Sequence, residues 1–359
     1  MARRRAGAFA LDLAAHLAGA AAKAAWWTAS GAAARAVVRP TKGEQATRFE
    51  PTTPPVSRPH LRRAYFSAFE KDARDVAAGL YPAMDTEVDA SDVFRRAADF
   101  LTDAAEVDAR RRRAHATEVR EVVNSKAYPS YYRQNFHYQT GGWFTADSAR
   151  RYDAQVEALF SGAAGAMRRR ALSLLARHWR GRDQRGLTIV DLACGSGAFL
   201  KDLSATFPRS RVMGVDLSPA YLAEARVRSG VRALAQANAE RLPFADASLD
   251  AITCVYLFHE LPPRVRPIVA AEIGRVLKPG GVLAFADSVQ PEDEPDLARL
   301  LEAFPAFFHE PYYASYATTD LPALFGAAGL TLEGADKAFL TKALLLEKSP
   351  SPLAGEGLG

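Results

Sequence analysis

Apolar residues recur at three- and four-residue spacing between residues 61 and 180, in runs such as YFSAFEKDARDVAAGLY and DVFRRAADFLTDAAEVDARRRRAHA. This spacing places them on one face of an α-helix, and strand signals are scarce in the same region. After Gly186 the pattern changes to short β-rich runs that alternate with helical stretches as far as Lys348. Such alternation is typical of βαβ units around a parallel sheet. The chain is therefore predicted to carry a mostly helical extension or lid over 61–180 and an α/β core over 181–349.

Residues 1–39 are rich in Ala and Arg and poor in acidic residues. Their longest uncharged stretch, 24–34, is well short of the roughly 18 or more apolar residues that a membrane-spanning helix needs. Asp12, His16 and Lys23 interrupt the apolar region that a secretory signal requires. Two interpretations remain, an amphipathic helix that lies on an anionic membrane surface and a helix that packs on its own protein. An organellar transit peptide has a similar composition.

Residues 40–60 contain five prolines and no apolar periodicity, which predicts an extended or disordered linker. Together with the helix before it, this linker makes an N-terminal unit of residues 1–60. At the other end of the chain, residues 350–359 are predicted to form a disordered tail.

The formal net charge of +5 is concentrated at the N-terminus. Residues 1–60 carry nine Lys or Arg against three acids, which leaves a net charge of −1 for the remaining residues. The basic character therefore comes from the tail and not from a nucleic-acid-binding core. Two arginine-rich stretches stand out within the rest of the chain. Acids surround the run at 109–116, which indicates a solvated helix face, whereas the series from Arg168 to Arg185 has only Asp183 nearby.

The two cysteines, Cys194 and Cys254, lie in runs that are predicted to form core strands or strand-end loops. Neither belongs to a CxxC motif, and no His/Cys cluster is near them in the sequence. This usage fits a reducing compartment and excludes a structural zinc site, and no metal ligands are predicted. Cys194 is interpreted as a small residue packed beside a glycine turn.

The stretch TIVDLACGSGAFL, residues 188–200, reads as an apolar strand, a loop with two glycines and the start of a helix. Ligands of α/β sheets bind outside the carboxyl ends of the strands, beside the first strand-to-helix turn. A dinucleotide fingerprint needs a third glycine where this chain has Leu200, and Lys201 is not placed as in a phosphate-binding P-loop. Two glycines that let backbone N–H groups approach an anion at a helix N-terminus suit a carboxylate.

The second strand, RVMGVD, ends at Asp216, 19 residues after Gly197. An acid at this point can accept hydrogen bonds from both hydroxyls of a ribose. The expected ligand is therefore a nucleoside that bears a carboxylate, and S-adenosylmethionine fits this description.

Residues 187–348 resemble the class I S-adenosylmethionine-dependent methyltransferases, most closely the group that includes ubiquinone/menaquinone-type and small-molecule methyltransferases. The matching segments, in the family's order, are IVDLACGSG, VMGVDLSP, ANAERLPFADASLDAITCVYLFHEL and EIGRVLKPGGVLAFADS. The resemblance implies a Rossmann-like seven-stranded sheet of order 3-2-1-4-5-7-6 with the last strand antiparallel. The segment LTLEGADKAFLTKALLLEK would then form the closing hairpin.

The resemblance also implies which residues bind S-adenosyl-L-methionine. It assigns the glycine loop, the ribose and the adenine to nine positions, namely Asp191, Ala193, Gly195, Gly197, Asp216, Leu217, Asn238, Ala239 and Glu240. The family usually has Asp at the position of Asn238, and Asn can still accept a hydrogen bond from the adenine amino group.

Methyl transfer needs a general base only when the acceptor atom carries a proton that must leave. Tyr256 and His259 follow a core strand and are expected at the ligand-binding edge of the sheet. His259 is the candidate for the base or for a residue that orients the acceptor, and capping of the next helix is the alternative. Glu260 is interpreted as a partner for a nearby cation or helix N-terminus.

Two aromatic segments, 128–153 and 304–321, are expected to build the acceptor pocket. The candidate residues within them are Tyr132, His137, Tyr138, His309, Tyr312 and Tyr313. Such a pocket suits a small acceptor that is aromatic, apolar or an amine.

The predicted activity is therefore methyl transfer from S-adenosylmethionine to a small metabolite. The alternatives are a regulatory protein that binds S-adenosylmethionine without transferring methyl, and an RNA methyltransferase, although no RNA-binding module is recognisable. The expected location is cytoplasmic, and residues 1–39 provide a candidate for peripheral contact with the inner face of a membrane.

Overall fold

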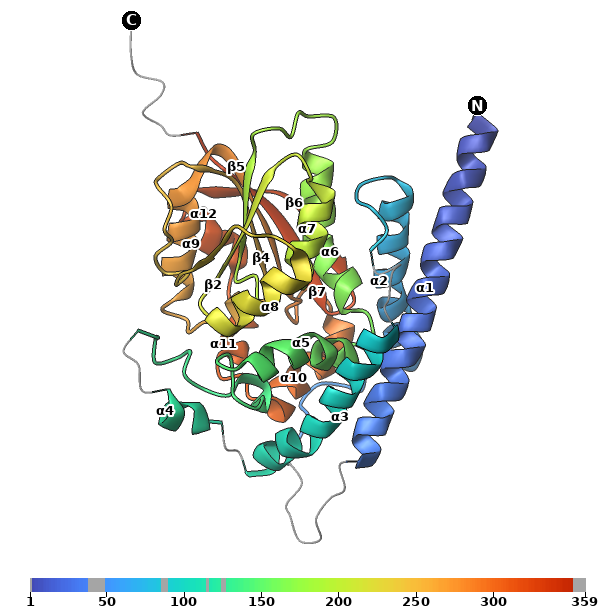
Figure 1. Ribbon diagram of the computed structural model, residues 1–359, viewed down its shortest axis with the longest axis vertical. Coiled ribbons are helices and arrows are strands. Elements are labelled where there is room, and N and C mark those ends of the chain that lie inside the picture. The colour runs from blue at the N-terminus through green and yellow to red at the C-terminus, as the bar shows by residue number, and fades with distance from the viewer. Residues whose placement is uncertain (1, 38–48, 85–89, 114–115, 124–126, 351–359) are drawn as a thin grey trace, which may run out of the picture.

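The computed structural model describes residues 2–37, 49–84, 90–113, 116–123 and 127–350. Within them, seven strands form one sheet in the order β3-β2-β1-β4-β5-β7-β6 (Figure 1). Their bounds are β1 (Thr188–Leu192), β2 (Arg211–Asp216), β3 (Leu234–Gln236), β4 (Leu249–Val255), β5 (Leu277–Ser288), β6 (Leu330–Ala338) and β7 (Thr341–Lys348). Strands β1 to β5 pair in parallel, whereas β7 is antiparallel to both β5 and β6. The predicted strand order, the antiparallel last strand and the closing hairpin are confirmed.

Helices cover both faces of the sheet, so its central strands are apolar along their length and not only on alternate residues. In β1, Ile189 packs into the core beneath α6 (Ala164–His178), α7 (Ala198–Thr206) and α8 (Pro219–Ser229). Its neighbour Val190 points to the opposite core, which α9 (Arg266–Val276) and α12 (Leu321–Gly326) cover. The sheet is thus the middle layer of three.

The region before the sheet is helical, as predicted, and has no strand among residues 58–84, 90–113, 116–123 and 127–180. Its other helices are α2 (Arg58–Ala77), α3 (Ala90–Arg113), α4 (Glu118–Val122) and α5 (Ala146–Leu159). Helix α6 precedes residue 181, yet it packs directly on β5, β6 and β7. Figure 1 shows α5 and α10 (Ala298–Phe307) beneath the end of the sheet opposite the C-terminus.

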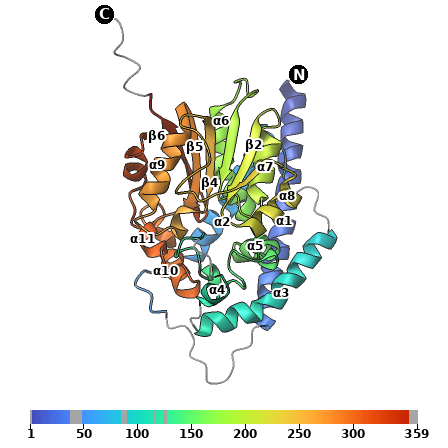
Figure 2. The same cartoon turned by 60° about the vertical axis from the view of Figure 1, so that its left-hand side comes forward.

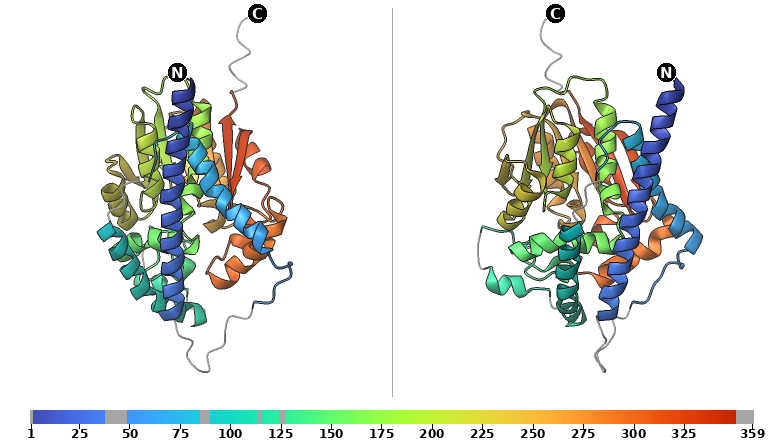
Figure 3. Two further views of the ribbon diagram at one scale, coloured as in Figure 1. Left: turned by 90° about the vertical axis from the view of Figure 1, so that its right-hand side faces the viewer. Right: turned by 45° about the vertical axis from the view of Figure 1, so that its right-hand side comes forward.

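Helix α1 (Ala2–Val37) packs along α2 and also contacts α3 and α5 (Figures 2 and 3). Trp27 is buried in this contact, and Lys23 donates a hydrogen bond to Glu157 of α5 at 3.0 Å. The segment therefore packs on its own protein, which was one of its two interpretations. No helix among the described residues is both long and apolar enough to span a bilayer.

Only part of the predicted linker, residues 40–60, lies within the described part of the chain. Residues 38–48 lie outside the described part of the chain, as do residues 351–359 of the predicted tail. Residues 49–57 run without regular structure beside α10, where the backbone N–H of Thr52 donates to Glu302 at 2.5 Å. Ser57 then caps α2. Because α2 begins at Arg58, the last residues of the predicted linker, 58–60, are helical.

Three arginines of α6, Arg168, Arg169 and Arg170, are buried and paired, which corrects the prediction that the series has only Asp183 for balance. Arg169 donates to Asp72 of α2 at 2.7 and 2.8 Å, and Arg170 donates to Asp75 at 2.9 Å. These acids precede the arginines by about a hundred positions, so proximity in the sequence could not reveal them. Arg169 and Arg170 therefore do not form the exposed basic surface that RNA binding needs.

Candidate active site

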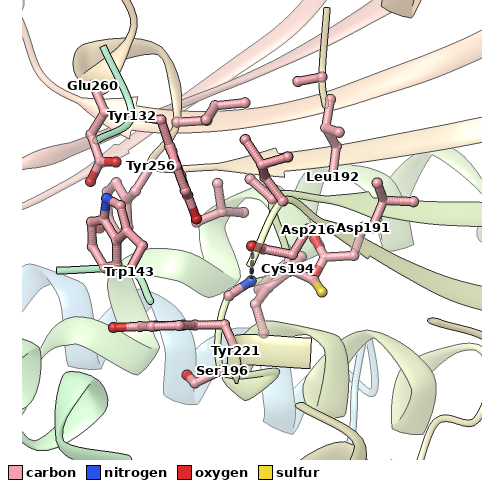
Figure 4. Close-up of a pocket in the computed structure, with 18 of the residues that line it drawn as sticks. Tyr132, Trp143, Asp191, Leu192, Cys194, Ser196, Asp216, Tyr221, Tyr256 and Glu260 are labelled. Carbon is pink, nitrogen blue, oxygen red and sulfur yellow. Dashed lines mark hydrogen bonds between the residues drawn. The ribbon is translucent and has the colours of Figure 1, made fainter. Parts of the chain in front are cut away.

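A cavity lies at the carboxyl ends of β1, β2 and β4, where the first strand-to-helix loop was expected to hold a ligand (Figure 4). Its floor comes from the loop after β1 and from the ends of β2 and β4. Its other wall comes from α5, α6 and the irregular segment 127–145, which lie before the sheet in the sequence. The site therefore combines the α/β core with the helical extension.

The loop after β1 is shaped by three left-handed residues, Ala193 (φ 56°), Gly195 (φ 53°) and Gly197 (φ 82°). A Cβ on Gly197 would lie 2.7 Å from the Cα of Ala225 in α8, so only glycine permits this approach of helix and loop. The turn presents backbone N–H groups at the start of α7, which is the arrangement that favours a bound anion.

Asp216, at the end of β2, is tied to this loop. One carboxylate oxygen accepts from Gly195 N at 2.9 Å, and the other accepts from Ser218 N at 2.8 Å (Figure 4). Burial raises the pKa of Asp216, while these backbone hydrogen bonds oppose the rise. A carboxylate has about four lone-pair sites, so Asp216 keeps the capacity to accept from further hydroxyl groups.

Asp191, the last acid of β1 before the loop, is only half satisfied. Its Oδ1 accepts from Thr253 at 2.7 Å, whereas the buried Oδ2 has no hydrogen-bond partner among the described residues. Burial raises the pKa of Asp191 to about 7, with a smaller upward contribution from Asp216 and a downward one from the Thr253 bond. Such a group would gain from a cationic partner in the cavity.

The third cofactor segment, Asn238 to Glu240, lies beside this loop. Leu217, Asn238 and Ala239 line the cavity, whereas Glu240 does not. Glu240 instead accepts from the Tyr131 hydroxyl at 2.7 Å and from the Asn238 side chain at 3.1 Å. Of the nine predicted cofactor residues, Gly197 and Glu240 therefore do not line the cavity but contact residues around it.

Several lining residues were not predicted as site residues, among them Trp143, Tyr152, Arg168 and Tyr221. Trp143 and Tyr152 belong to the aromatic segment 128–153, so that segment was the available signal. Arg168 carried no signal, because its position in an arginine series indicated only surface charge. It is buried, and its guanidinium donates to Asp153 at 3.2 Å.

At the other end of the cavity, Tyr132, Tyr256 and Glu260 contribute to the lining (Figure 4). Tyr256 has a left-handed backbone (φ 57°), and its hydroxyl hydrogen-bonds Thr341. His259 follows β4 as expected, but its buried ring does not line the cavity, and its Nδ1 lies 2.5 Å from Asp287 Oδ1. Of these two neighbouring residues, Glu260 lines the cavity and His259 does not.

Behind Glu260 lies a cluster of His137, His259 and Glu310, whose ligand atoms are within 4.8 Å of one another. Burial on its own would lower the pKa of His259, but Asp287 raises it to about 10. Burial also disfavours the charged form of His137, and the pairing with Glu310 raises its pKa above the ordinary value. Burial raises the pKa of Glu260 to about 8, although His259 opposes this rise.

The remaining predicted acceptor residues lie around this cluster and not on the cavity wall. His309 Nε2 lies 2.7 Å from the Gln134 side chain, and its ring is next to that of Tyr138. The hydroxyl of Tyr313 lies 2.7 Å from that of Ser288, and Gln134 reaches the Tyr312 hydroxyl at 3.5 Å. Of the six predicted acceptor residues, only Tyr132 lines the cavity.

Comparison with known proteins decides the family. A family model described as "Methyltransferase domain" matches residues 189–281. The chain is 31% identical over 153 residues to an uncharacterised methyltransferase of Synechocystis sp., a match that covers 41% of this chain and 68% of that protein. The chain belongs to the class I S-adenosylmethionine-dependent methyltransferases.

Other relatives and solved structures are similar over the same region. Demethylmenaquinone methyltransferase of Deinococcus radiodurans is 33% identical over 150 residues, a match covering 41% of this chain and 59% of that protein. For several curated relatives the match spans only about half of their length. Magnesium protoporphyrin IX methyltransferase from Synechocystis, solved with bound S-adenosylhomocysteine, is 16% identical, with a TM-score of 0.41 over 52% of this chain and 85% of that one.

The cofactor of this methyltransferase is S-adenosylmethionine, and the cavity residues fit its charges. The unpartnered Oδ2 of Asp191 suits the cationic amino group, and the guanidinium of Arg168 on the cavity wall suits the carboxylate. Asp216 retains acceptor capacity for the ribose hydroxyls. The amino and carboxylate groups of the methionyl moiety therefore each have a partner of opposite charge.

The affinity for S-adenosylmethionine is expected to rise with pH as Asp191 ionises. Because the pKa of this carboxyl is raised to about 7, it is increasingly protonated below that pH and loses its attraction for the amino group. We expect the dissociation constant to increase by up to about tenfold for each pH unit below 7. Calorimetric titration between about pH 5 and pH 7 measures this, and Asp191→Asn should remove the slope. An equal slope in that variant would assign the titration to another group.

Proposed function

We propose that this protein transfers the methyl group of S-adenosylmethionine to a small aromatic or apolar metabolite held beside Tyr132, Tyr256 and Glu260. The observation that carries the proposal is that one cavity is lined both by the cofactor residues and by an acid–base group in an aromatic wall. The relatives named as demethylmenaquinone methyltransferases support an apolar ring as the acceptor. The tyrosine faces also suit an amine.

When bound, S-adenosylmethionine supplies an activated methyl group, so that the acceptor atom bonds to the methyl carbon while the carbon–sulfur bond breaks and its electron pair stays on sulfur. The chain's own residues then have three tasks. The glycine loop and Asp216 fix the position of the cofactor, which supplies much of the acceleration in a displacement of this kind. Tyr132 and Tyr256 exclude water and orient the acceptor. Glu260 accepts the acceptor's proton when the reacting atom carries one.

Product formation tests the proposal. The protein is incubated with methyl-labelled S-adenosylmethionine and the small-molecule fraction of cells from its own source. We expect S-adenosylhomocysteine to form in equal amount to a labelled product of low mass. Binding of S-adenosylmethionine without any label transfer would instead indicate a regulatory protein. Label transfer only in a parallel incubation with the RNA fraction would indicate an RNA methyltransferase.

The variant Asp216→Ala is the matched test of the cofactor assignment. Losing charge-assisted hydrogen bonds to the ribose is expected to weaken S-adenosylmethionine binding by about 2 kcal/mol or more, roughly 30-fold. Calorimetry measures this affinity, and thermal unfolding checks that the variant is folded. Unchanged affinity would refute the ribose assignment without affecting the proposal for the acceptor end.

A further inference from the structure

The cluster of His137, His259 and Glu310 draws its members from three distant segments. His137 lies in a short helical turn (Phe136–Tyr138), His259 in a second one (Phe258–Glu260) after β4, and Glu310 in the loop after α10. The backbone N–H of His137 donates to His309 O at 3.2 Å, which holds the first and third segments together. The cluster is therefore a fixed part of the fold at the acceptor end of the cavity.

One carboxylate of this cluster is buried with only half of its hydrogen-bonding capacity used. The side chain of Glu310 is 0% exposed, and its Oε1 pairs closely with Nε2 of His137. Its Oε2 has no hydrogen-bond partner among the described residues. Buried polar atoms are almost always satisfied, so such an atom calls for a partner. The ligand atoms of all three residues lie within 4.8 Å of one another.

A carboxylate holds the far ring nitrogen of His259, as is usual for a histidine that binds a metal. Its Nδ1 lies 2.5 Å from Asp287 Oδ1, which leaves Nε2 directed to the cluster. Asp287 is itself held, because Oδ2 accepts from the backbone N–H of Phe258 at 2.9 Å. A carboxylate that fixes the far nitrogen of a histidine sets the ring orientation and raises its strength as a ligand.

We propose that His137, His259 and Glu310 bind one divalent transition-metal cation, for which Zn²⁺ and Mn²⁺ are suitable ions. Two imidazoles and one carboxylate form a donor set that these ions accept while keeping an open coordination position. In a tetrahedral zinc site, ligand atoms lie about 3.4 Å apart, given metal–nitrogen distances of about 2.1 Å. The present atoms span at most 4.8 Å, so side-chain movements are sufficient to reach coordination distance.

The local backbone and the surroundings fit such a site. His137 and Tyr138 both have left-handed φ values of 56°, a strained conformation that concentrates at functional positions. Aromatic rings enclose the cluster: Phe304 and Phe308 lie near His137, and Tyr313 near His259. An apolar shell of this kind restricts water and strengthens the binding of an ion by charged ligands.

The proposed role of the ion depends on the proposed methyl transfer. The proposal that the ion binds to the cluster does not depend on it. Glu260 Oε1 lies 4.0 Å from Nε2 of both histidines and is the group between the cluster and the cavity. An acceptor oxygen that enters from the cavity would meet the open coordination position beside this carboxylate. The site therefore assigns the acceptor to the class of molecules with a hydroxyl or enol oxygen, whose proton passes to Glu260 as the oxygen attacks the methyl carbon.

Metal content tests the proposal. The full-length protein is stripped with a chelator, incubated separately with excess Zn²⁺ or Mn²⁺, freed of unbound ion by gel filtration and analysed by mass spectrometry. We expect about one ion per chain in the parent and close to none in Glu310→Gln and His137→Gln. His178→Gln is the matched control, because this histidine ends α6 outside the cluster, and it should retain the ion. A parent that retains neither ion, or cluster variants that bind like the parent, would overturn the site.

Two further measurements keep the result interpretable. Glu310→Gln preserves side-chain shape, and its amide can still hydrogen-bond His137, so it is expected to fold, and thermal unfolding without metal verifies this. Asp287→Asn keeps all three ligands and should weaken ion binding by about 10- to 100-fold, which calorimetry can measure. If the protein binds the ion but transfers no methyl, the proposed function fails and the metal site stands. If the protein transfers methyl but binds no ion, the metal site fails and the proposed function stands.

Discussion

Replacing Glu260 with Gln is expected to lower the rate of methyl transfer by about 10²- to 10⁴-fold, the usual contribution of a positioned acid–base group. Glu260 is the carboxylate of the loop after β4 that lines the cavity, and it lies beside Tyr132 and Tyr256 (Figure 4). Glutamine has the same shape but cannot accept the acceptor's proton. The affinity for S-adenosylmethionine should be unchanged, because the cofactor residues lie at the ends of β1, β2 and β3 and not in the loop after β4.

Single-turnover formation of S-adenosylhomocysteine, with the active small-molecule fraction as acceptor, measures this effect. The control is Glu333→Gln, which changes an exposed carboxylate on β6 and should react like the parent. The content of Zn²⁺ or Mn²⁺ should also be normal in Glu260→Gln, since this residue is not one of the three proposed ligands. Full turnover in the variant would mean that the reacting atom has no proton to lose or that another group removes it.

The sheet and the cofactor end could be predicted because their signals are local. The loop with Gly195 and Gly197, and the acid Asp216 at the end of the next strand, lie within a few residues of the strands that position them. Parallel strands buried on both faces read as apolar runs, so their order along the chain was visible as well. These segments also carry the family resemblance, and the matched region, residues 189–281, contains the glycine loop and Asp216.

The acceptor end could not be predicted in the same way, because its residues meet only in the folded chain. His137 and Glu310 are adjacent in space although they lie in different aromatic segments on either side of the core. A search for metal ligands by sequence spacing therefore finds nothing there. The sequence also favoured His259 as the group at the ligand edge, whereas the folded loop directs it to Asp287 and leaves Glu260 at the cavity.

A second large effect is expected at Asp72, which lies 2% exposed between three helices. Its carboxylate accepts two hydrogen bonds from Arg169 of α6, at 2.7 and 2.8 Å, and one from the Tyr81 hydroxyl at 2.8 Å. Its Oδ2 also lies 2.9 Å from Nε2 of His16 in α1. The N-terminal helix, α2 and the helix that covers the sheet are thus joined through one buried acid.

Asp72→Ala is expected to lower the free energy of unfolding by about 3–5 kcal/mol, because it leaves a buried arginine without its principal partner. Urea denaturation followed by circular dichroism measures the loss. Asp147→Ala is the control, since Asp147 pairs with Arg150 at an exposed position of α5 and should change stability by no more than about 0.5 kcal/mol. A loss at Asp72 as small as at Asp147 would show that the buried pairs do not hold these helices together.

The pH dependence of a second variant, Asp72→Asn, gives an independent check. Burial by itself would raise the pKa of Asp72, but the paired cations, Arg169 first, hold it well below its usual range. A carboxyl with a depressed pKa contributes stability that is fully present above its unfolded-state pKa, about 3.9, and is lost as the pH falls towards the folded-state value. The difference in unfolding free energy between the parent and Asp72→Asn should therefore be constant near neutrality and shrink below about pH 4. A difference that does not shrink in acid would mean that Asp72 contributes through packing and not through its charge.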